Sequence, residues 1–237
     1  MRFILDAQAT KSDRQDLKKS KIQVKILFED PDVIVAEKPA GLLTISTSKE
    51  KRQTAYAQLY DHVKNKARRE KLFIVHRLDR DASGLLVFAK SESAKFYLQQ
   101  QFKDHRAGRT YVAVTERRIT RDQFTIRSYL AENSIHRCYS TPDPARGKLA
   151  ITHVKVMKRS ACRTRVEVRL ETGRKHQIRV HLAEAGYPLV GDQTYGSSRN
   201  PFHRLALHAA GLAFEHPRTR EVMVFHSRPP ASFAALV

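Results

Sequence analysis

Two carboxylates, Asp79 and Asp81, lie in a short charged stretch in which each has an arginine as a neighbour. The stretch reads IVHRLDRDASGLLVFAK over residues 74–90, and Arg77 and Arg80 flank the first aspartate. A carboxylate next to a guanidinium group stays ionised, because the cation favours the charged form. Such a group is a poor proton donor but a usable nucleophile or general base. The residues alone do not separate Asp79 from Asp81, and a purely structural aspartate–arginine pair would give the same local pattern.

Two apolar segments flank the charged stretch and would hold it against the core. Residues 72–75 and 85–89 are rich in β-forming side chains, and Ala-Ser-Gly at 82–84 is a turn signal. Burying charged groups beside such strands costs free energy unless they are paired or take part in chemistry. We therefore expect a functional loop between two strands.

Helical spacing of apolar residues occurs in three further segments. One helix is expected to begin at Thr54, a second to follow Ser91 as its N-cap, and a third to end at Gly186. Strand patterns occupy residues 33–36, 110–114, 148–157, 164–170, 204–214 and 221–227. Because strands and helices do not alternate regularly, we predict one α+β domain with a mixed, mainly antiparallel sheet and flanking helices. It would span residues 23–237, behind a polar, basic tail at residues 1–22.

The charge balance indicates the partner. The chain has 44 Lys and Arg against 24 Asp and Glu, a formal net charge of +20. Positive charges in such excess repel one another, and proteins that carry them usually bind a polyanionic partner. Nucleic acid is the expected partner, and no obligate protein partner is inferred. A membrane is not expected, because no apolar run approaches the roughly 18 residues of a span and no segment is basic on one face and strongly apolar on the other.

Several chemical classes find no support in the sequence. The two cysteines, Cys138 and Cys162, are too few for a disulfide framework, and with no secretory signal we expect reduced thiols in the cytoplasm. His176 and His181 are five residues apart rather than four and lack a neighbouring glutamate, so no metal site is predicted. The order of residues in HRLDRD differs from the kinase catalytic loop, and no phosphate-binding glycine motif is present.

Four segments in order resemble the RluA-type family of RNA pseudouridine synthases. EKPAGLL at 37–43, HRLDRDASGLLVFAK at 76–90, RTYVAV at 109–114 and ETGRKHQIRVHLAEAGYPLVGDQTYG at 171–196 resemble the family's motifs, and RLALHAAGLAFEHPRT at 204–219 resembles its C-terminal strand. The resemblance covers roughly residues 22 to 230. It implies the pseudouridine synthase fold, with the catalytic loop in a basic cleft across the sheet.

The resemblance also assigns roles to single residues. Asp79 falls on the catalytic aspartate, Tyr111 on the tyrosine that stacks on the target base, and Arg179 on the arginine that pairs with the carboxylate. Arg77 matches a position implicated in displacing the target base from the RNA. The implied reaction isomerises specific uridines in ribosomal or transfer RNA without a cofactor or metal. Whether the aspartate attacks the sugar or the base, or removes a sugar proton, stays open.

The chain departs from the family pattern at two positions and in length. Glu37 stands where the family usually has asparagine, and Ala82 where it usually has threonine, which removes a hydroxyl that could hold the catalytic loop. The tail of about 22 residues is too short for the small RNA-binding module of many relatives, so we expect a short form. The alternative function is a non-catalytic RNA-binding or ribosome-assembly protein on the same fold, which would not require Asp79, Tyr111 and Arg179 together.

Overall fold

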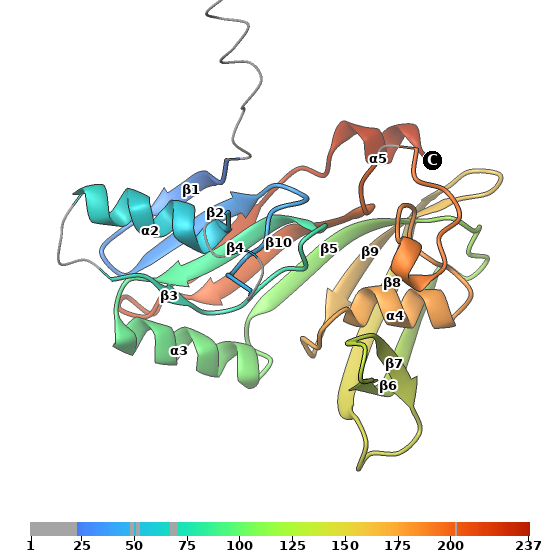
Figure 1. Ribbon diagram of the computed structural model, residues 1–237, viewed down its shortest axis with the longest axis horizontal. Coiled ribbons are helices and arrows are strands. Elements are labelled where there is room, and N and C mark those ends of the chain that lie inside the picture. Colours follow the sequence, from blue (N-terminus) through green and yellow to red (C-terminus); the bar gives the residue numbers. More distant parts are fainter. Residues whose placement is uncertain (1–22, 48–49, 51–52, 67–70, 202) are drawn as a thin grey trace, which may run out of the picture.

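A single long sheet runs through the computed structural model, which describes residues 23–47, 50, 53–66, 71–201 and 203–237 (Figure 1). The expected tail at residues 1–22 lies outside this part of the chain. Within it, eleven strands join in the order β1-β2-β4-β10-β5-β9-β8-β6-β7, with β3 also pairing with β4 and β11 with β10. The strands are β1 (Lys25–Glu29), β2 (Val33–Lys38), β3 (Phe73–Ile74), β4 (Ser83–Ala89), β5 (Gly108–Thr115), β6 (Gln123–Glu132), β7 (Cys138–Thr141), β8 (Lys148–Arg159), β9 (Thr164–Leu170), β10 (Leu207–Glu215) and β11 (Val222–His226).

One parallel contact, between β4 and β10, interrupts an otherwise antiparallel sheet. The sheet is therefore mixed and mainly antiparallel, as predicted. The contact is very close, since a Cβ added to Gly84 would lie 2.2 Å from the carbonyl oxygen of Ala209. The interpretation of residues 82–84 as a turn is wrong, because Ser83 and Gly84 are the first residues of β4. Gly84 has no side chain, so the backbones of β4 and β10 can approach this closely, and it adopts a φ of +114° that favours glycine.

Helices cover both faces of the sheet at β2 and β4 (Figure 1). Helix α2 (Ala55–Lys66) packs Leu59 and Val63 on one face, while α3 (Glu92–Lys103) packs Ala94 and Leu98 on the other. Strands buried on both sides read as continuous apolar runs, which explains the runs VIVA in β2 and LLVFA in β4. Ser91 caps α3 as expected, accepting a hydrogen bond from the Ala94 amide at 3.1 Å.

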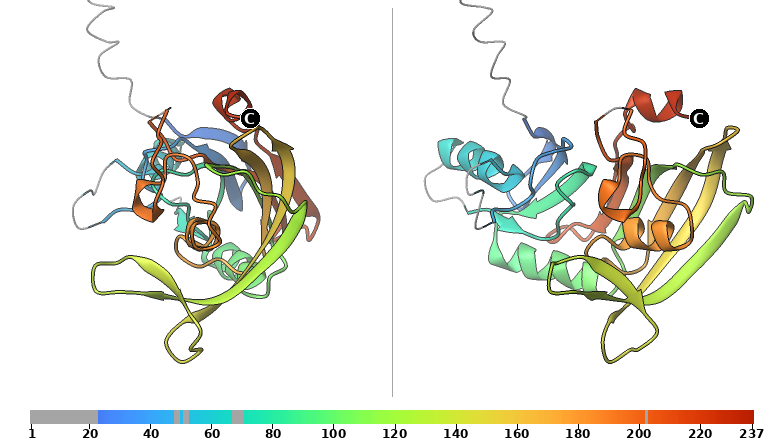
Figure 2. Two further views of the ribbon diagram at one scale, coloured as in Figure 1. Left: turned by 90° about the vertical axis from the view of Figure 1, so that its right-hand side faces the viewer. Right: turned by 45° about the vertical axis from the view of Figure 1, so that its right-hand side comes forward.

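The other half of the sheet is covered more sparsely (Figure 2). Helix α4 (Gln177–Glu184) packs on the inner side of β8 and β9, whose buried residues alternate with exposed ones. The short helix α5 (Ala231–Ala235) covers β5 on the outer side, and a 3-10 turn, η2 (Gln193–Tyr195), follows α4. Among the described residues no helix is both long and apolar enough to cross a bilayer. The inner side of this half, under α4, is where the charged loop meets the sheet.

Candidate active site

A pocket of about 600 Å³ opens where the 75–82 loop, the end of α3, the start of β5, the end of β9 and the start of α4 meet. Among its described lining residues Asp79 is the only carboxylate. Five lysines and arginines share the wall with it: Arg77, Lys103, Arg109, Arg174 and Arg179. This is the basic cleft that the resemblance implied, and its charge suits an anionic ligand.

Arg179 bridges two carboxylates at the base of the pocket. Its Nε and Nη2 atoms each donate to one oxygen of Asp192 at 2.8 Å, and its Nη1 reaches Asp79 Oδ2 at 3.4 Å. The side chain of Asp192 is only 1% exposed, whereas that of Asp79 is 24% exposed. Burial alone would lower the pKa of Arg179, but the hydrogen bonds and charge of Asp192, with those of Asp79, raise it above its ordinary value. Asp192 therefore holds Arg179 in place as a charged guanidinium group. Because Asp79 accepts only one long hydrogen bond from that group, it still has an oxygen that faces the pocket.

His176, at the N-terminus of α4, lies on the other side of the same carboxylate. Its Nε2 atom is 3.9 Å from Asp79 Oδ1, and its Nδ1 is 2.8 Å from the hydroxyl of Tyr195. That hydroxyl also accepts from the Cys138 amide at 3.1 Å, so Tyr195 ties the start of α4 to β7. Burial lowers the pKa of His176, although Asp79 opposes the shift. A neutral imidazole can lie beside Asp79 without balancing the charge of the carboxylate, which leaves that role to Arg179.

Tyr111 forms part of the pocket wall from the middle of β5. The side chain is buried, and the residue pairs with Val168 of β9 and Ala209 of β10. Burial raises its pKa, with Arg109 opposing and Asp79 adding to the shift, so the phenol remains neutral at ordinary pH. The structure thus places a rigid aromatic side chain in the same pocket as the carboxylate.

The pocket mouth carries the cations. Arg77 is exposed there and makes no hydrogen bond to the described residues, whereas Arg109 is packed over the ring of Phe102 at 5.4 Å. Burial lowers the pKa of Arg109, and its Nε is buried without a hydrogen-bond partner in the described residues. A Cβ added to Gly173 would lie 2.3 Å from Arg109 Nη1. The glycine of the Thr-Gly-Arg segment therefore makes room for this guanidinium.

Lys38 fixes the backbone of the 75–82 loop. Its side chain is fully buried, and its Nζ donates to the carbonyl oxygens of Pro39, Leu42 and Arg80 at 2.7 to 2.9 Å. Burial lowers its pKa to about 7, although Asp81 and Asp79 oppose the shift. The Gly41 amide also donates to the Arg80 carbonyl at 2.9 Å. These bonds fix the residue that follows Asp79.

Thr44 fixes the residue that precedes Asp79. Its buried hydroxyl donates to the Leu78 carbonyl at 2.9 Å and accepts from the Leu78 amide at 3.1 Å. The Thr44 carbonyl in turn accepts from the Tyr56 amide in the first turn of α2. The segment 38–44 therefore forms hydrogen bonds with both neighbours of Asp79, namely Leu78 and Arg80. For this reason the Lys-Pro-Ala-Gly loop, although distant in sequence, belongs to the site.

The C-terminal end of the loop is anchored in the sheet. Ser83 Oγ lies 2.8 Å from His208 Nδ1 and accepts from Arg204 Nη2 at 2.7 Å. His208 Nε2 continues to Ser227 at 3.0 Å, so the chain of bonds spans β4, β10 and the end of β11. All these groups are satisfied within the protein, which favours one loop conformation.

The structure brings all four expected site residues, Asp79, Tyr111, Arg179 and Arg77, into one pocket. Sequence reasoning did not assign roles to Lys38, Thr44, His176 or Asp192, although their positions in the structure make them supports for the site. Lys38, His176 and Asp192 lie within the motif segments and Thr44 directly follows one, so the spacing of these motifs was the available signal. Only the fold shows that they surround one carboxylate.

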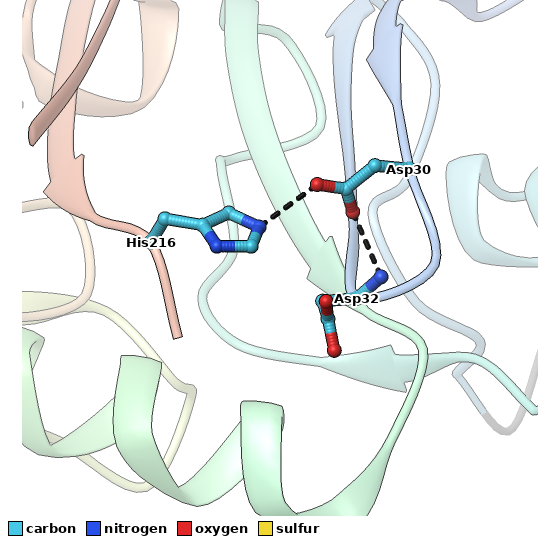
Figure 3. A group of neighbouring side chains, drawn as sticks. All are labelled: Asp30, Asp32 and His216. Carbon is cyan, nitrogen blue, oxygen red and sulfur yellow. Dashed lines mark hydrogen bonds and ion pairs between the residues drawn. The ribbon is translucent and has the colours of Figure 1, made fainter. Parts of the chain in front are cut away.

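A group of possible metal ligands, Asp30, Asp32 and His216, lies at the ends of the β1–β2 and β10–β11 hairpins (Figure 3). His216 Nδ1 accepts from the amides of Arg218 and Thr219, so its proton is on Nε2 and points to Asp30 Oδ2 at 2.8 Å. Asp30 also accepts from the Asp32 amide, and Asp32 pairs with Arg218 at 2.7 Å. A protonated Nε2 has no lone pair for a metal. The hydrogen bonds of the cluster join the two hairpins.

Comparisons with known proteins identify the family of this chain. A family model described as RNA pseudouridylate synthase matches residues 32–184. An uncharacterized RNA pseudouridine synthase of Bacillus subtilis is 38% identical over 216 residues, covering 90% of this chain and 71% of the relative. Ribosomal large subunit pseudouridine synthase D of Pasteurella multocida is 35% identical over 230 residues, covering 91% and 70%.

Solved structures show the same fold. Human RNA pseudouridylate synthase domain containing 4 superposes with a TM-score of 0.75 at 21% identity, covering 89% of this chain and 90% of that one. Human RNA pseudouridylate synthase domain containing 1 gives a TM-score of 0.73 at 26% identity, covering 90% and 86%. With the family model, the relatives and the fold in agreement, this chain belongs to the RNA pseudouridylate synthase family and is an isomerase that acts on RNA.

Proposed function

We propose that this chain converts uridine to pseudouridine in ribosomal or transfer RNA, with Asp79 as the reacting carboxylate. The observation that carries the proposal is the pairing of Asp79 with Arg179 at the base of a basic pocket in which it is the only described carboxylate. A relative named ribosomal large subunit pseudouridine synthase D supports ribosomal RNA as one target class. The cytoplasm, where such RNA is found, is the location that fits.

The reaction requires little beyond a positioned carboxylate and an enclosed space. The bond between C1′ and N1 of uridine breaks, a bond between C1′ and C5 forms, C5 loses a proton and N1 gains one. The product is an isomer, so the net change needs no electron acceptor or phosphate donor. A pocket of about 600 Å³ falls in the usual range for small-molecule sites and would retain the detached base while it turns.

Each pocket residue has a role in this proposal. Asp79 acts while ionised, with Arg179 balancing its charge, and either sugar or base attack is compatible with its exposed oxygen. Tyr111 offers a face for stacking the flipped base, an interaction worth about 1–3 kcal/mol. Extruding a nucleotide from structured RNA costs a few kcal/mol, and Arg77 at the mouth would occupy the space that the base leaves.

The test is a comparison of the native chain with Asp79→Asn on unmodified ribosomal and transfer RNA transcripts, with pseudouridine mapped at nucleotide resolution. The proposal expects pseudouridine at defined positions with the native chain and none with the variant. Equal RNA binding by both proteins without modification of either RNA class would favour the non-catalytic alternative. Modification by the variant would remove Asp79 from the mechanism.

A further inference from the structure

A second strongly basic surface lies away from the pocket. We define the distal basic patch as residues 117–122, between β5 and β6, and residues 155–165, around the β8–β9 turn. It holds eight basic residues, namely Arg117, Arg118, Arg121, Lys155, Lys158, Arg159, Arg163 and Arg165, and a single acidic one, Asp122. The two connections lie together at the right-hand edge of Figure 1.

Hydrogen bonds hold the two segments of the patch together. The Arg159 guanidinium donates to the carbonyl oxygens of Ile119, Thr120 and Arg121 at 2.8 to 3.3 Å and to Asp122 at 2.6 Å. Arg118 donates across to the Ser160 carbonyl at 3.0 Å. The patch is therefore a fixed surface rather than two independent loops, so its charges are already arranged for a ligand.

Most of the basic residues in the patch form no ion pair within the described part of the chain, although Lys155 stands opposite Glu167 in the β8–β9 pairing. Among the described residues, only Arg159 of the eight basic residues forms an ion pair. Lys158 stands directly opposite Arg165 in the β8–β9 pairing, an arrangement of like charges that destabilises a sheet. The Nε of Arg165 is also buried without a hydrogen-bond partner in the described structure. The like-charge pair costs stability in the free protein, and a ligand that supplies negative charge would relieve this repulsion.

The patch and the pocket lie at opposite ends of the same strand. Leu170, at the end of β9, lines the pocket, whereas Thr164, at its start, belongs to the patch. Six residues of strand at about 3.3 Å each separate them by roughly 20 Å. One rigid sheet thus fixes the distance between the catalytic carboxylate and the patch.

We infer that the distal basic patch is a second RNA-docking surface, which binds backbone phosphates about 20 Å from the reacting uridine. This inference rests on the proposed action on RNA and adds a contact outside the catalytic pocket. Phosphates fit the chemistry, because guanidinium groups bind phosphate oxygens in pairs. An apolar protein or lipid partner does not fit, since Met157 is the only exposed large apolar side chain among the patch residues. The patch would favour folded RNA long enough to reach both sites.

The experiment removes three exposed or half-buried patch charges in an Asp79→Asn background, so that the RNA stays unmodified during binding. The variant is Arg117→Gln/Arg121→Gln/Arg163→Gln. The matched control removes three exposed charges elsewhere, Lys25→Gln/Lys71→Gln/Arg228→Gln. The dissociation constant is measured against salt for a transcript containing a duplex that spans the patch and for a short stem-loop that fills only the pocket.

For the long RNA, loss of three phosphate contacts is expected to reduce the slope of log affinity against log salt by about 2.7 and to weaken binding more than tenfold at low salt. The short stem-loop should bind the patch variant and the control equally. An unchanged slope in the patch variant, or an equal loss in the control, would overturn the inference. Pseudouridine formation by the native chain on the same long RNA is assayed separately, so that failure of the proposed function is distinguished from failure of the patch.

Discussion

Replacing Asp192 with asparagine tests how the site holds its arginine. Asp192 is almost fully buried and accepts hydrogen bonds from Nε and Nη2 of Arg179, both at 2.8 Å. Asparagine keeps the shape but removes the charge and turns one acceptor into a donor that faces another donor. Breaking a buried ion pair on one side costs about 3–5 kcal/mol, because the remaining charge stays buried. Asp79, 3.4 Å from Nη1, replaces only part of the lost interaction. For a chain of this length, that cost corresponds to a fall in melting temperature of roughly 6 to 20 °C.

The same change is expected to act on catalysis through Asp79. Without Asp192, the guanidinium is free to move toward Asp79, now 3.4 Å from Nη1, and to cover the oxygen that faces the pocket. Misplacing a reacting group by about 1 Å can cost about 100-fold, so we expect kcat to fall between about 10- and 100-fold with a much smaller change in KM.

Thermal unfolding and steady-state pseudouridine formation, measured side by side on Asp192→Asn and Asp122→Asn, check this prediction. Asp122 forms an equally short ion pair with Arg159, but its side chain is 88% exposed, so its loss should cost less than about 1 kcal/mol. Equal melting temperatures for the two variants, or native kcat in Asp192→Asn, would refute the reasoning.

Three further predictions follow from the supports of the pocket. Thr44→Val should leave the Leu78 amide unpaired, lower the free energy of unfolding by about 1–3 kcal/mol and reduce kcat, with Thr44→Ser restoring both in denaturation and rate assays. Gly173→Ala should displace Arg109 and raise KM for RNA while the melting temperature changes little, and native KM would contradict this. Burial lowers the pKa of His181 to about 4, so the unfolded chain binds more protons between pH 6.5 and 4 and stability falls on acidification. Urea titrations should show about 2 kcal/mol lost through this group by pH 5, and a His181→Gln variant should lack that loss.

The spacing of the motifs was the main sequence signal for the site, and hydrophobic periodicity was the main signal for the fold. The pattern Val166, Val168 and Leu170 predicted β9 at its observed bounds, and Ser91 and Gly186 marked the beginning of α3 and the end of α4. These signals are local, so they can be read directly from the sequence.

The elements that were not predicted depend on distant partners. Strands β6 and β7 are half-exposed and partly polar, with Ser128 on the inner face, and they form because β8 offers an edge for pairing. The small residues at 82–84 resemble a turn, because the sequence does not show that Ala209 approaches Gly84. The roles of Thr44 and Asp192 likewise depend on contacts across 34 and 13 residues of chain.

The central claim is that Asp79, and not its neighbour Asp81, carries out the reaction. Asp79 lines the pocket and contacts Arg179, whereas Asp81 is exposed and does not line the pocket. Asp79→Asn and Asp81→Asn should be compared under single-turnover conditions on an RNA that the native chain modifies, labelled with tritium at C5 of uridine. The new C1′–C5 bond displaces that tritium, so its release reports the reaction itself. We predict no release with Asp79→Asn and nearly native release with Asp81→Asn; release by Asp79→Asn, or its loss only in Asp81→Asn, would contradict the account.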